Sequence, residues 1–231
     1  MFKDDSPEIQ RSISIEYISN VYKNHIKIYT DGSKTQSGAG FSFYVPWLSI
    51  RKAISCSGIH SPFHIELMAI HYALLWVLDN STILNTVIIL TDCLSALQAI
   101  NNFQCNNANK MTTEIVNAIN QAEVYGTEIT LAWVPGHAGI PGNEEADGLA
   151  RSVASTEMPP INDTSITKGD AKAHIKEHCM RLWDGKYTQT EKGSHYKIFQ
   201  PYVMQSLPSS SNRLANPILF RLQSGVGLRG L

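Results

Sequence analysis

Apolar residues recur along this chain at two spacings, and the change from one to the other separates expected strands from expected helices. Alternation of apolar and polar side chains predicts strands over 26–30, 38–45 and 48–57. The third strand carries Arg51 and Lys52, charges that are typical of the edge of a sheet. The regular part of the chain is therefore expected to begin with an antiparallel meander.

The following part alternates between helical stripes and short apolar runs. A stripe from 65 to 77 predicts a helix, and the continuous run 87–90 indicates a strand that is covered on both faces. A short helix, a longer helix, a strand and a last helix are then expected over 94–100, 115–122, 129–133 and 141–154. The order βββαβααβα predicts an α/β fold, a five-stranded mixed sheet with helices on both faces.

The two ends of the chain lack this regular pattern. Residues 1–24 are expected to form a leader with at most a short helix, residues 25–155 the domain, and residues 156–231 a partly helical tail. The first 155 residues contain 9 Lys and Arg against 14 Asp and Glu, whereas the tail contains 10 against 6. A basic tail attracts polyanions, although a difference of this size is also compatible with ordinary sampling.

Composition narrows the class of protein. The 231 residues are 43% hydrophobic, which is enough to bury one good core. The four cysteines show no C-x-x-C spacing, which favours reduced thiols in an intracellular protein over a disulfide framework. Neither an apolar signal region nor a stretch long enough to cross a bilayer stands out, so we expect no membrane attachment.

The densest group of chemically informative residues is WVPGHAGIPGNEEAD, residues 133–147. It contains His137 in a glycine-flanked loop and Asp147 on the last expected helix. Three upstream carboxylates each lie at the end of an expected strand or near the start of an expected helix: Asp31, Glu66 and Asp92. Such positions converge on one edge crevice of an open α/β sheet. Four carboxylates and a nearby histidine suit a divalent-metal site for phosphodiester cleavage.

Taken one at a time, these residues also have ordinary structural explanations. The sequence Asp-Gly-Ser at 31–33 has the composition of a turn after the first strand. Glu66 is compatible with a capping or helix-dipole role, and Asp92 with the N-cap of the next helix. Asp147 could lie on a solvated helix face, and His137 could be a surface loop residue.

Taken together, the same residues resemble a known family, type 1 ribonuclease H. The resemblance is carried by four acids in order and a histidine ahead of the last of them: Asp31, Glu66, Asp92, His137 and Asp147. The sequence AWVPGHAGI followed by GNE, within 132–144, is closest to the ribonuclease H domain of non-LTR retrotransposon polyproteins. The resemblance extends over residues 26–154 and implies a ribonuclease H-like fold.

The resemblance also implies roles for these residues. Asp31 would bridge two Mg²⁺ ions, for which Mn²⁺ could substitute. Glu66 and Asp92 would hold the ion on the leaving-group side, and Asp147 would hold the ion on the nucleophile side. His137 would shuttle a proton or help the product to leave. The implied reaction is endonucleolytic cleavage of the RNA strand of RNA–DNA hybrids, leaving 3′-hydroxyl and 5′-phosphate ends.

Substrate contacts are harder to assign. Gly32 and Ser33 would let RNA sugars approach closely, and Asn143 could cap the last helix or fix the loop before it. Cellular members carry two asparagines just before the metal-binding glutamate, where this chain has SPFHI at 61–65. Bacterial members carry a basic handle after the third acid, where this chain has FQCNNAN at 103–109. We therefore expect poor hybrid binding by the isolated domain, with a reverse transcriptase domain of a longer polyprotein holding the substrate.

Three functional hypotheses remain. The first is an active nuclease, expected to be a monomer. The second is a decayed element fragment that folds and binds hybrid without turnover. The third, a cellular housekeeping ribonuclease H, is disfavoured by the element-like loop and the basic tail. The sequence RLQSG at 221–225 is similar to a worn form of the segment that follows this domain in such polyproteins, which favours a fragment or degraded copy.

A second possible metal-binding pair lies in the tail. His174 and His178 stand four residues apart on an expected helix, with Cys179 beside them. No further ligand pair completes a tetrahedral zinc site, so a solvated helix face is the better interpretation.

Overall fold

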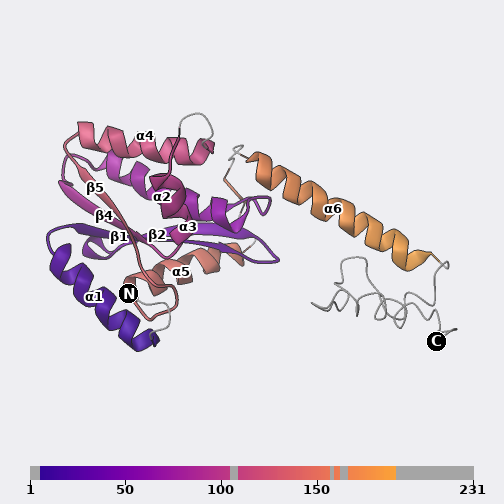
Figure 1. Ribbon diagram of the computed structural model, residues 1–231, viewed down its shortest axis with the longest axis horizontal. Coiled ribbons are helices and arrows are strands. Elements are labelled where there is room, and N and C mark those ends of the chain that lie inside the picture. Colours follow the sequence, from indigo (N-terminus) through magenta and orange to yellow (C-terminus); the bar gives the residue numbers. More distant parts are fainter. Residues whose placement is uncertain (1–5, 105–108, 157–158, 162–165, 191–231) are drawn as a thin grey trace, which may run out of the picture. The chain divides into compact units, whose positions relative to one another are not determined.

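The computed structural model describes residues 6–104, 109–156, 159–161 and 166–190. Five strands form one mixed sheet in the order β3-β2-β1-β4-β5. They are β1 (Ile26–Lys34), β2 (Ala39–Val45), β3 (Ile50–Cys56), β4 (Thr86–Thr91) and β5 (Glu128–Trp133). β1 pairs antiparallel with β2 and parallel with β4, and β3 lies at an edge, as its charges predicted. The predicted α/β fold with a five-stranded mixed sheet is confirmed (Figure 1).

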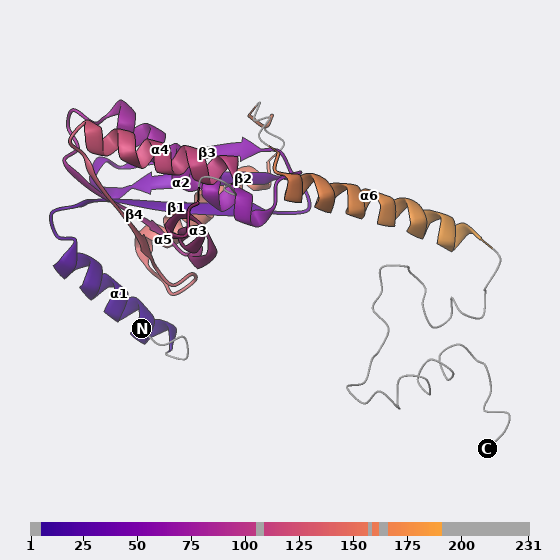
Figure 2. The ribbon, with the colours of Figure 1, turned by 45° about the horizontal axis from the view of Figure 1, so that its top comes forward.

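Helices cover both faces of this sheet. The helices of the described residues are α1 (Pro7–Val21), α2 (Pro62–Asp79), α3 (Leu94–Asn101), α4 (Lys110–Val124), α5 (Pro141–Ala154) and α6 (Lys168–Gln189), with a short 3₁₀ turn, η1 (Pro46–Leu48), between β2 and β3. The sheet is covered by the first five of these, α1 to α5. α2 and α4 lie on one side of the sheet, and α1 and α5 lie on the other (Figures 1 and 2). The helices predicted from apolar spacing are therefore all present.

Two hydrophobic clusters fill the space between these layers. The larger one lies between the sheet and α2 and α4, with Phe41, Leu67 and Ile115 fully buried. The smaller one lies on the opposite face and includes Ile18 of α1 together with Leu90 of β4. Fully burying one such side chain contributes about 1.5–3 kcal/mol to stability. α1 has 15 residues and is longer than the short helix expected in this segment. Through Ile18 it contributes to the smaller core.

The first strand differs from the prediction at its end. Residues 31–33 were expected to form a turn, but they lie inside β1, which continues to Lys34. Gly32 is paired with Phe41 of β2, and Ser33 with Gly40. The ladder to β2 therefore overrides the local turn preference of Asp-Gly-Ser, and Asp31 sits within the sheet.

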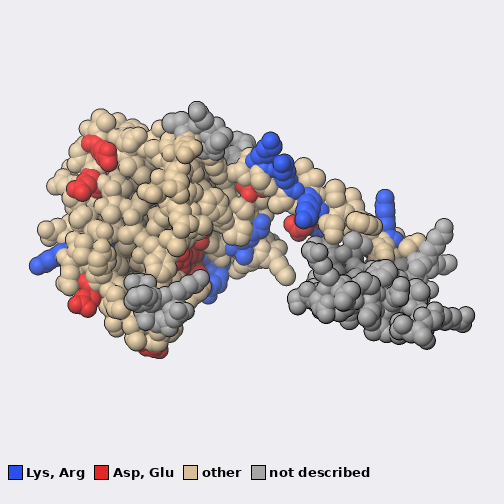
Figure 3. All heavy atoms as spheres, in the orientation of Figure 1, with Lys and Arg blue, Asp and Glu red and all other residues tan. Residues whose placement is uncertain are grey.

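The chain divides into two compact units, residues 1–170 and 171–231. α6 begins in the first unit, and Lys and Arg side chains are visible along it (Figure 3). No helix among the described residues is both long and apolar enough to span a membrane. Of the cysteines in the described part, Cys56, Cys93 and Cys179 form no disulfide. Cys105 and the segment 221–225 lie outside the described residues.

Candidate metal centre

Three of the predicted acids meet at one point of the fold. Asp31, Glu66 and Asp92 each place a carboxylate oxygen within 4.8 Å of the other two. The sheet brings the first and third together, because β1 and β4 are neighbouring parallel strands paired up to Thr30 and Thr91. Asp31 is the next residue of β1 and Asp92 is the residue directly after β4, so this register places them side by side.

Glu66 reaches the same point because α2 passes unusually close to β1 at Gly32. A Cβ atom on Gly32 would lie 2.8 Å from the Glu66 amide nitrogen and 2.9 Å from the Ile65 carbonyl carbon. Real Cβ atoms do not approach backbone atoms so closely, so only glycine allows this contact. The Gly32 backbone also hydrogen-bonds the Glu66 carboxylate. The structure thus gives Gly32 a packing role in bringing Glu66 to Asp31.

The pKa values of all three carboxyl groups are raised, so their ionised forms are disfavoured in the metal-free fold. Asp31 is 6% exposed, and burial together with the charges of Asp92 and Asp147 raises its pKa to about 7. Burial, followed by the charges of Asp31 and Asp92, raises the pKa of Glu66 well above its usual value. Burial also raises the pKa of Asp92, although a hydrogen bond from Asn143 opposes the rise.

Asp147 lies beside this trio rather than within it. It groups with His137 and Glu144, and its carboxylate forms an ion pair with Arg151 one helical turn later. Its charge nevertheless contributes to the raised pKa values of Asp31, Glu66 and Asp92, so it faces the same region. The Ser42 hydroxyl holds this part of α5 against β2 by donating to the Ala146 carbonyl at 2.6 Å.

The loop before α5 carries His137 beside the carboxylates. His137 has a left-handed backbone with φ of 53°, which is uncommon outside glycine. The loop is held at two points. The amide of Gly139 donates to Glu144 at 3.0 Å, and Gly136 lies so close to Asp92 that an added Cβ would approach the carboxylate to 2.6 Å. The exposed imidazole of His137 is thereby kept near Asp92, where its charge lowers the pKa of that acid.

Asn143 and Arg151 make contacts that sequence reasoning did not assign. Asn143 was considered as a helix cap, a loop support or a substrate contact, whereas its amide donates to Asp92 Oδ2 at 3.3 Å from a position only 2% exposed. Arg151 was not considered. Its spacing of four residues from Asp147 on a helix was a usable signal for an ion pair.

The donor atoms at this centre fit a hard divalent cation. Glu66 Oε2 is buried without a hydrogen-bond partner among the described residues, and the three clustered side chains offer oxygen ligands alone. Mg²⁺ and similar ions prefer oxygen ligands over nitrogen or sulfur. A cation would also remove the repulsion that raises the carboxyl pKa values. The arrangement is therefore suited to binding divalent metal between the ends of β1, β4 and α2.

The chain is similar to known proteins in sequence and in structure. A family model described as RNase H matches residues 23–155. Among solved structures, the chain is similar to the N-terminal RNase H domain of a Mycobacterium tuberculosis protein, solved as a fusion with maltose binding protein. The two are 16% identical with a TM-score of 0.41, and the match covers 56% of this chain and 99% of the other.

Proposed function

This chain belongs to the RNase H family, and from that premise we propose that it hydrolyses the RNA strand of RNA–DNA hybrids with divalent metal, Mg²⁺ being the preferred ion and Mn²⁺ a substitute. The observation that carries the proposal is the trio Asp31, Glu66 and Asp92, one buried and two partly buried carboxylates with raised pKa values and oxygen ligands only. Such a group destabilises the metal-free fold but is well suited to bind cations.

Each residue has a proposed task in this reaction. Asp31 would be shared between two ions, while Glu66 and Asp92 would hold one of them and Asp147 the other. The bound ions would lower the pKa of the attacking water and stabilise the leaving oxygen. His137, exposed on its loop beside Asp92, would take up or release a proton as product leaves.

We also propose that the domain comes from a retrotransposon polyprotein in which a reverse transcriptase domain grips the hybrid. The sequence at 132–144 supports this origin. The segment 61–65 supports the need for an external grip, since Ser61 caps α2 and His64 is 1% exposed. The buried His64 side chain cannot contact a substrate as the asparagines of cellular members do.

The absence of asparagines at 61–65 also suits a second candidate function, a decayed element fragment that binds hybrid without turnover. It predicts measurable binding to an RNA–DNA hybrid together with no cleavage under any divalent ion. The retained trio weighs against it, because buried like charges that serve no cation would be lost readily under drift.

The deciding experiment is gel-resolved cleavage of an end-labelled RNA–DNA hybrid with Mg²⁺, Mn²⁺ or EDTA, with Asp92→Asn as the inactive control. We expect cleavage with either metal, none with EDTA, and loss of activity in the variant. Duplex DNA and single-stranded RNA should remain intact. Cleavage that persists in Asp92→Asn or in EDTA would contradict the proposal, and a folded protein that binds hybrid without cutting it would establish the second candidate.

Asn143→Ala is expected to lower kcat/KM by about 10–100-fold, because Asp92 loses the amide that orients its carboxylate. The measurement is initial cleavage rate against substrate and Mg²⁺ concentration. Asn101→Ala, at an exposed position near the end of α3, is the matched control and should leave both dependences unchanged. Equal rates for the two variants would show that the Asn143 contact has no part in the reaction.

Arg151→Ala is expected to lower the Mg²⁺ concentration needed for half-maximal activity by about 3–10-fold. The guanidinium competes with a cation for Asp147 and places positive charge near Asp31, and a nearby like charge of this kind is worth about 1 kcal/mol. Arg51→Ala removes a comparable exposed ion pair, with Glu145, and serves as the control. An unchanged or weaker Mg²⁺ dependence in Arg151→Ala would refute the competition.

A further inference from the structure

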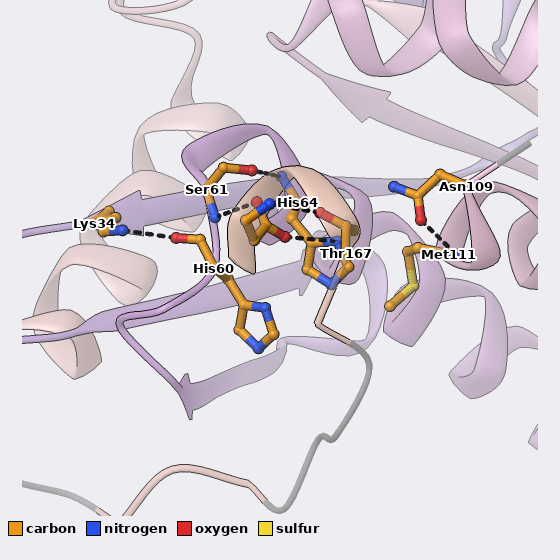
Figure 4. A network of polar contacts seen from close by, with 8 residues as sticks. Lys34, His60, Ser61, His64, Asn109, Met111 and Thr167 are labelled. Atoms are coloured by element: carbon orange, nitrogen blue, oxygen red, sulfur yellow. Dashed lines mark hydrogen bonds and ion pairs between the residues drawn. The ribbon is translucent and has the colours of Figure 1, made fainter. Parts of the chain in front are cut away.

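A second cluster of ligand-type side chains lies at the N-terminal end of α2. His60, His64 and Asp170 are 0%, 1% and 3% exposed, and each offers a ligand atom within 4.8 Å of the other two. The two imidazole rings are stacked, with centroids 4.7 Å apart. Nδ1 of His64 lies 3.8 Å from Oδ2 of Asp170. All three residues belong to the compact unit 1–170. Figure 4 shows His60 and His64 at the start of α2.

His60 is difficult to explain as a core residue. Both of its ring nitrogens are buried without a hydrogen-bond partner among the described residues. A buried polar atom left unsatisfied costs about 1–3 kcal/mol, so histidine at this position requires a further partner. A metal ion would supply that partner, because a neutral imidazole nitrogen is a metal ligand.

The backbone around the cluster is held in place. The Lys34 ammonium donates to the His60 carbonyl at 2.7 Å, and the Ser61 amide donates to Asp170 Oδ1 at 3.1 Å. The Asp170 amide in turn donates to the Thr167 hydroxyl at 3.0 Å. Burial raises the pKa of Asp170, but the hydrogen bonds from Ser61 and Thr167 outweigh it and leave the pKa below its usual value. The Ser61 amide thus fixes one carboxylate oxygen, Oδ1, while the other, Oδ2, lies on the side of the His64 imidazole.

From these contacts we propose that His60, His64 and Asp170 form a binding site for a transition-metal ion of the zinc class. Imidazole nitrogens suit zinc and its neighbours, whereas Mg²⁺ prefers oxygen alone. A point equidistant from three atoms 4.8 Å apart lies about 2.8 Å from each, so every donor needs to move less than about 1 Å to reach zinc bond lengths. Water would complete a four-coordinate shell.

This site would join two distant parts of the chain. Asp170 lies at the start of α6, whereas His60 and His64 lie on either side of the N-cap residue of α2. His64 is two residues before Glu66. A bound ion would therefore fasten the segment after the domain to the helix that carries a catalytic-site carboxylate. The proposal does not depend on the nuclease assignment, because its ligands and its preferred metal both differ from those of the carboxylate trio.

The test uses the full chain carrying Asp31→Asn and Asp92→Asn, so that zinc cannot occupy the carboxylate trio. The protein is stripped with EDTA, mixed with one equivalent of ZnCl₂ and desalted, and retained zinc is measured by elemental analysis. His60→Gln and Asp170→Asn are compared in this background. His174→Gln with His178→Gln is the matched control, since it removes two exposed histidines of α6.

We expect about one zinc per chain in the protein that carries only Asp31→Asn and Asp92→Asn, which we call the background, and in the control that also lacks His174 and His178. Each site variant should bind zinc at least about a hundredfold more weakly in competition with a chromophoric chelator. Zinc at a hundredfold excess over Kd should raise the Tm of the background by about 5–10 °C and leave Asp170→Asn, which keeps the side-chain volume, unchanged. Zinc retention that is equal in background and both site variants, or absent in the background, would overturn the proposal.

Discussion

Asparagine in place of Asp31 is expected to abolish hybrid cleavage, by at least about a thousandfold, and at the same time to stabilise the metal-free protein. The loss of activity follows because this carboxylate is the proposed shared ligand, and metal ions contribute several kcal/mol to such reactions. The gain in stability follows because burial and neighbouring acids make the Asp31 charge unfavourable. We expect a gain on the order of 2 kcal/mol at pH 8 in EDTA.

The size of this stability difference depends on pH. The folded pKa of Asp31 is about 7, above its ordinary value of 3.8, so between these pH values the folded state holds a proton that the unfolded chain has released. Its contribution to stability is therefore present at low pH and is lost as pH rises from about 4 to about 7. The variant should lack this part of the decline.

Denaturant unfolding in EDTA at pH 5 and pH 8 measures both parts of the prediction, with cleavage assayed on the same preparations. Asp79→Asn, at an exposed carboxylate near the end of α2, is the matched control and should change neither stability nor activity. Adding Mg²⁺ should stabilise the wild type more than Asp31→Asn. A variant that is less stable than the wild type at pH 8, or that retains a tenth of the activity, would contradict the assignment of Asp31.

Alanine in place of Gly32 is the second change with a large expected effect. Its Cβ would meet backbone atoms of Ile65 and Glu66 at 2.8–2.9 Å, and backbone cannot turn aside as a side-chain tip can. α2 must therefore move away from β1, at a cost of about 3 kcal/mol and a fall in Tm of about 10 °C. Because Glu66 moves with the helix, we also expect cleavage to fall by at least about a hundredfold.

Thermal unfolding followed by circular dichroism, and cleavage at a temperature where the variant is folded, test this prediction. Gly58→Ala provides the control, since a Cβ there meets no atom within 4 Å. If Gly32→Ala folds with normal stability and cuts hybrid at the wild-type rate, the close contact between β1 and α2 does not position Glu66.

Much of the fold could be predicted because apolar spacing reports which face of each element is buried. The continuous run 87–90 became the buried centre of β4, and Arg51 and Lys52 marked β3 as an edge strand. The extent of β1 could not be read in this way, because Asp-Gly-Ser at 31–33 has a local turn preference that only the pairing with β2 overrides. The length of α1 was also missed, because its apolar residues do not form a clear stripe.

The candidate site was predictable for a different reason. Asp31 lies within β1 and Asp92 directly follows β4, and these two strands prove to be parallel neighbours, so a pattern of strands was enough to expect their side chains to converge. The contact from Asn143 to Asp92 depends on how α5 is oriented over the sheet, which spacing alone does not specify. The cluster of His60, His64 and Asp170 was hidden because its third member is more than a hundred residues away in sequence.

The register that sets Asp31 beside Asp92 also has a consequence for folding kinetics. The trio joins β1, α2 and the end of β4, so it is complete only when pairings between distant segments have formed. Without a bound cation, the mutual repulsion of these carboxylates disfavours their approach early in folding. A ligand for such a late contact acts on the unfolding step, so a bound metal ion would slow unfolding while leaving the folding rate almost unchanged.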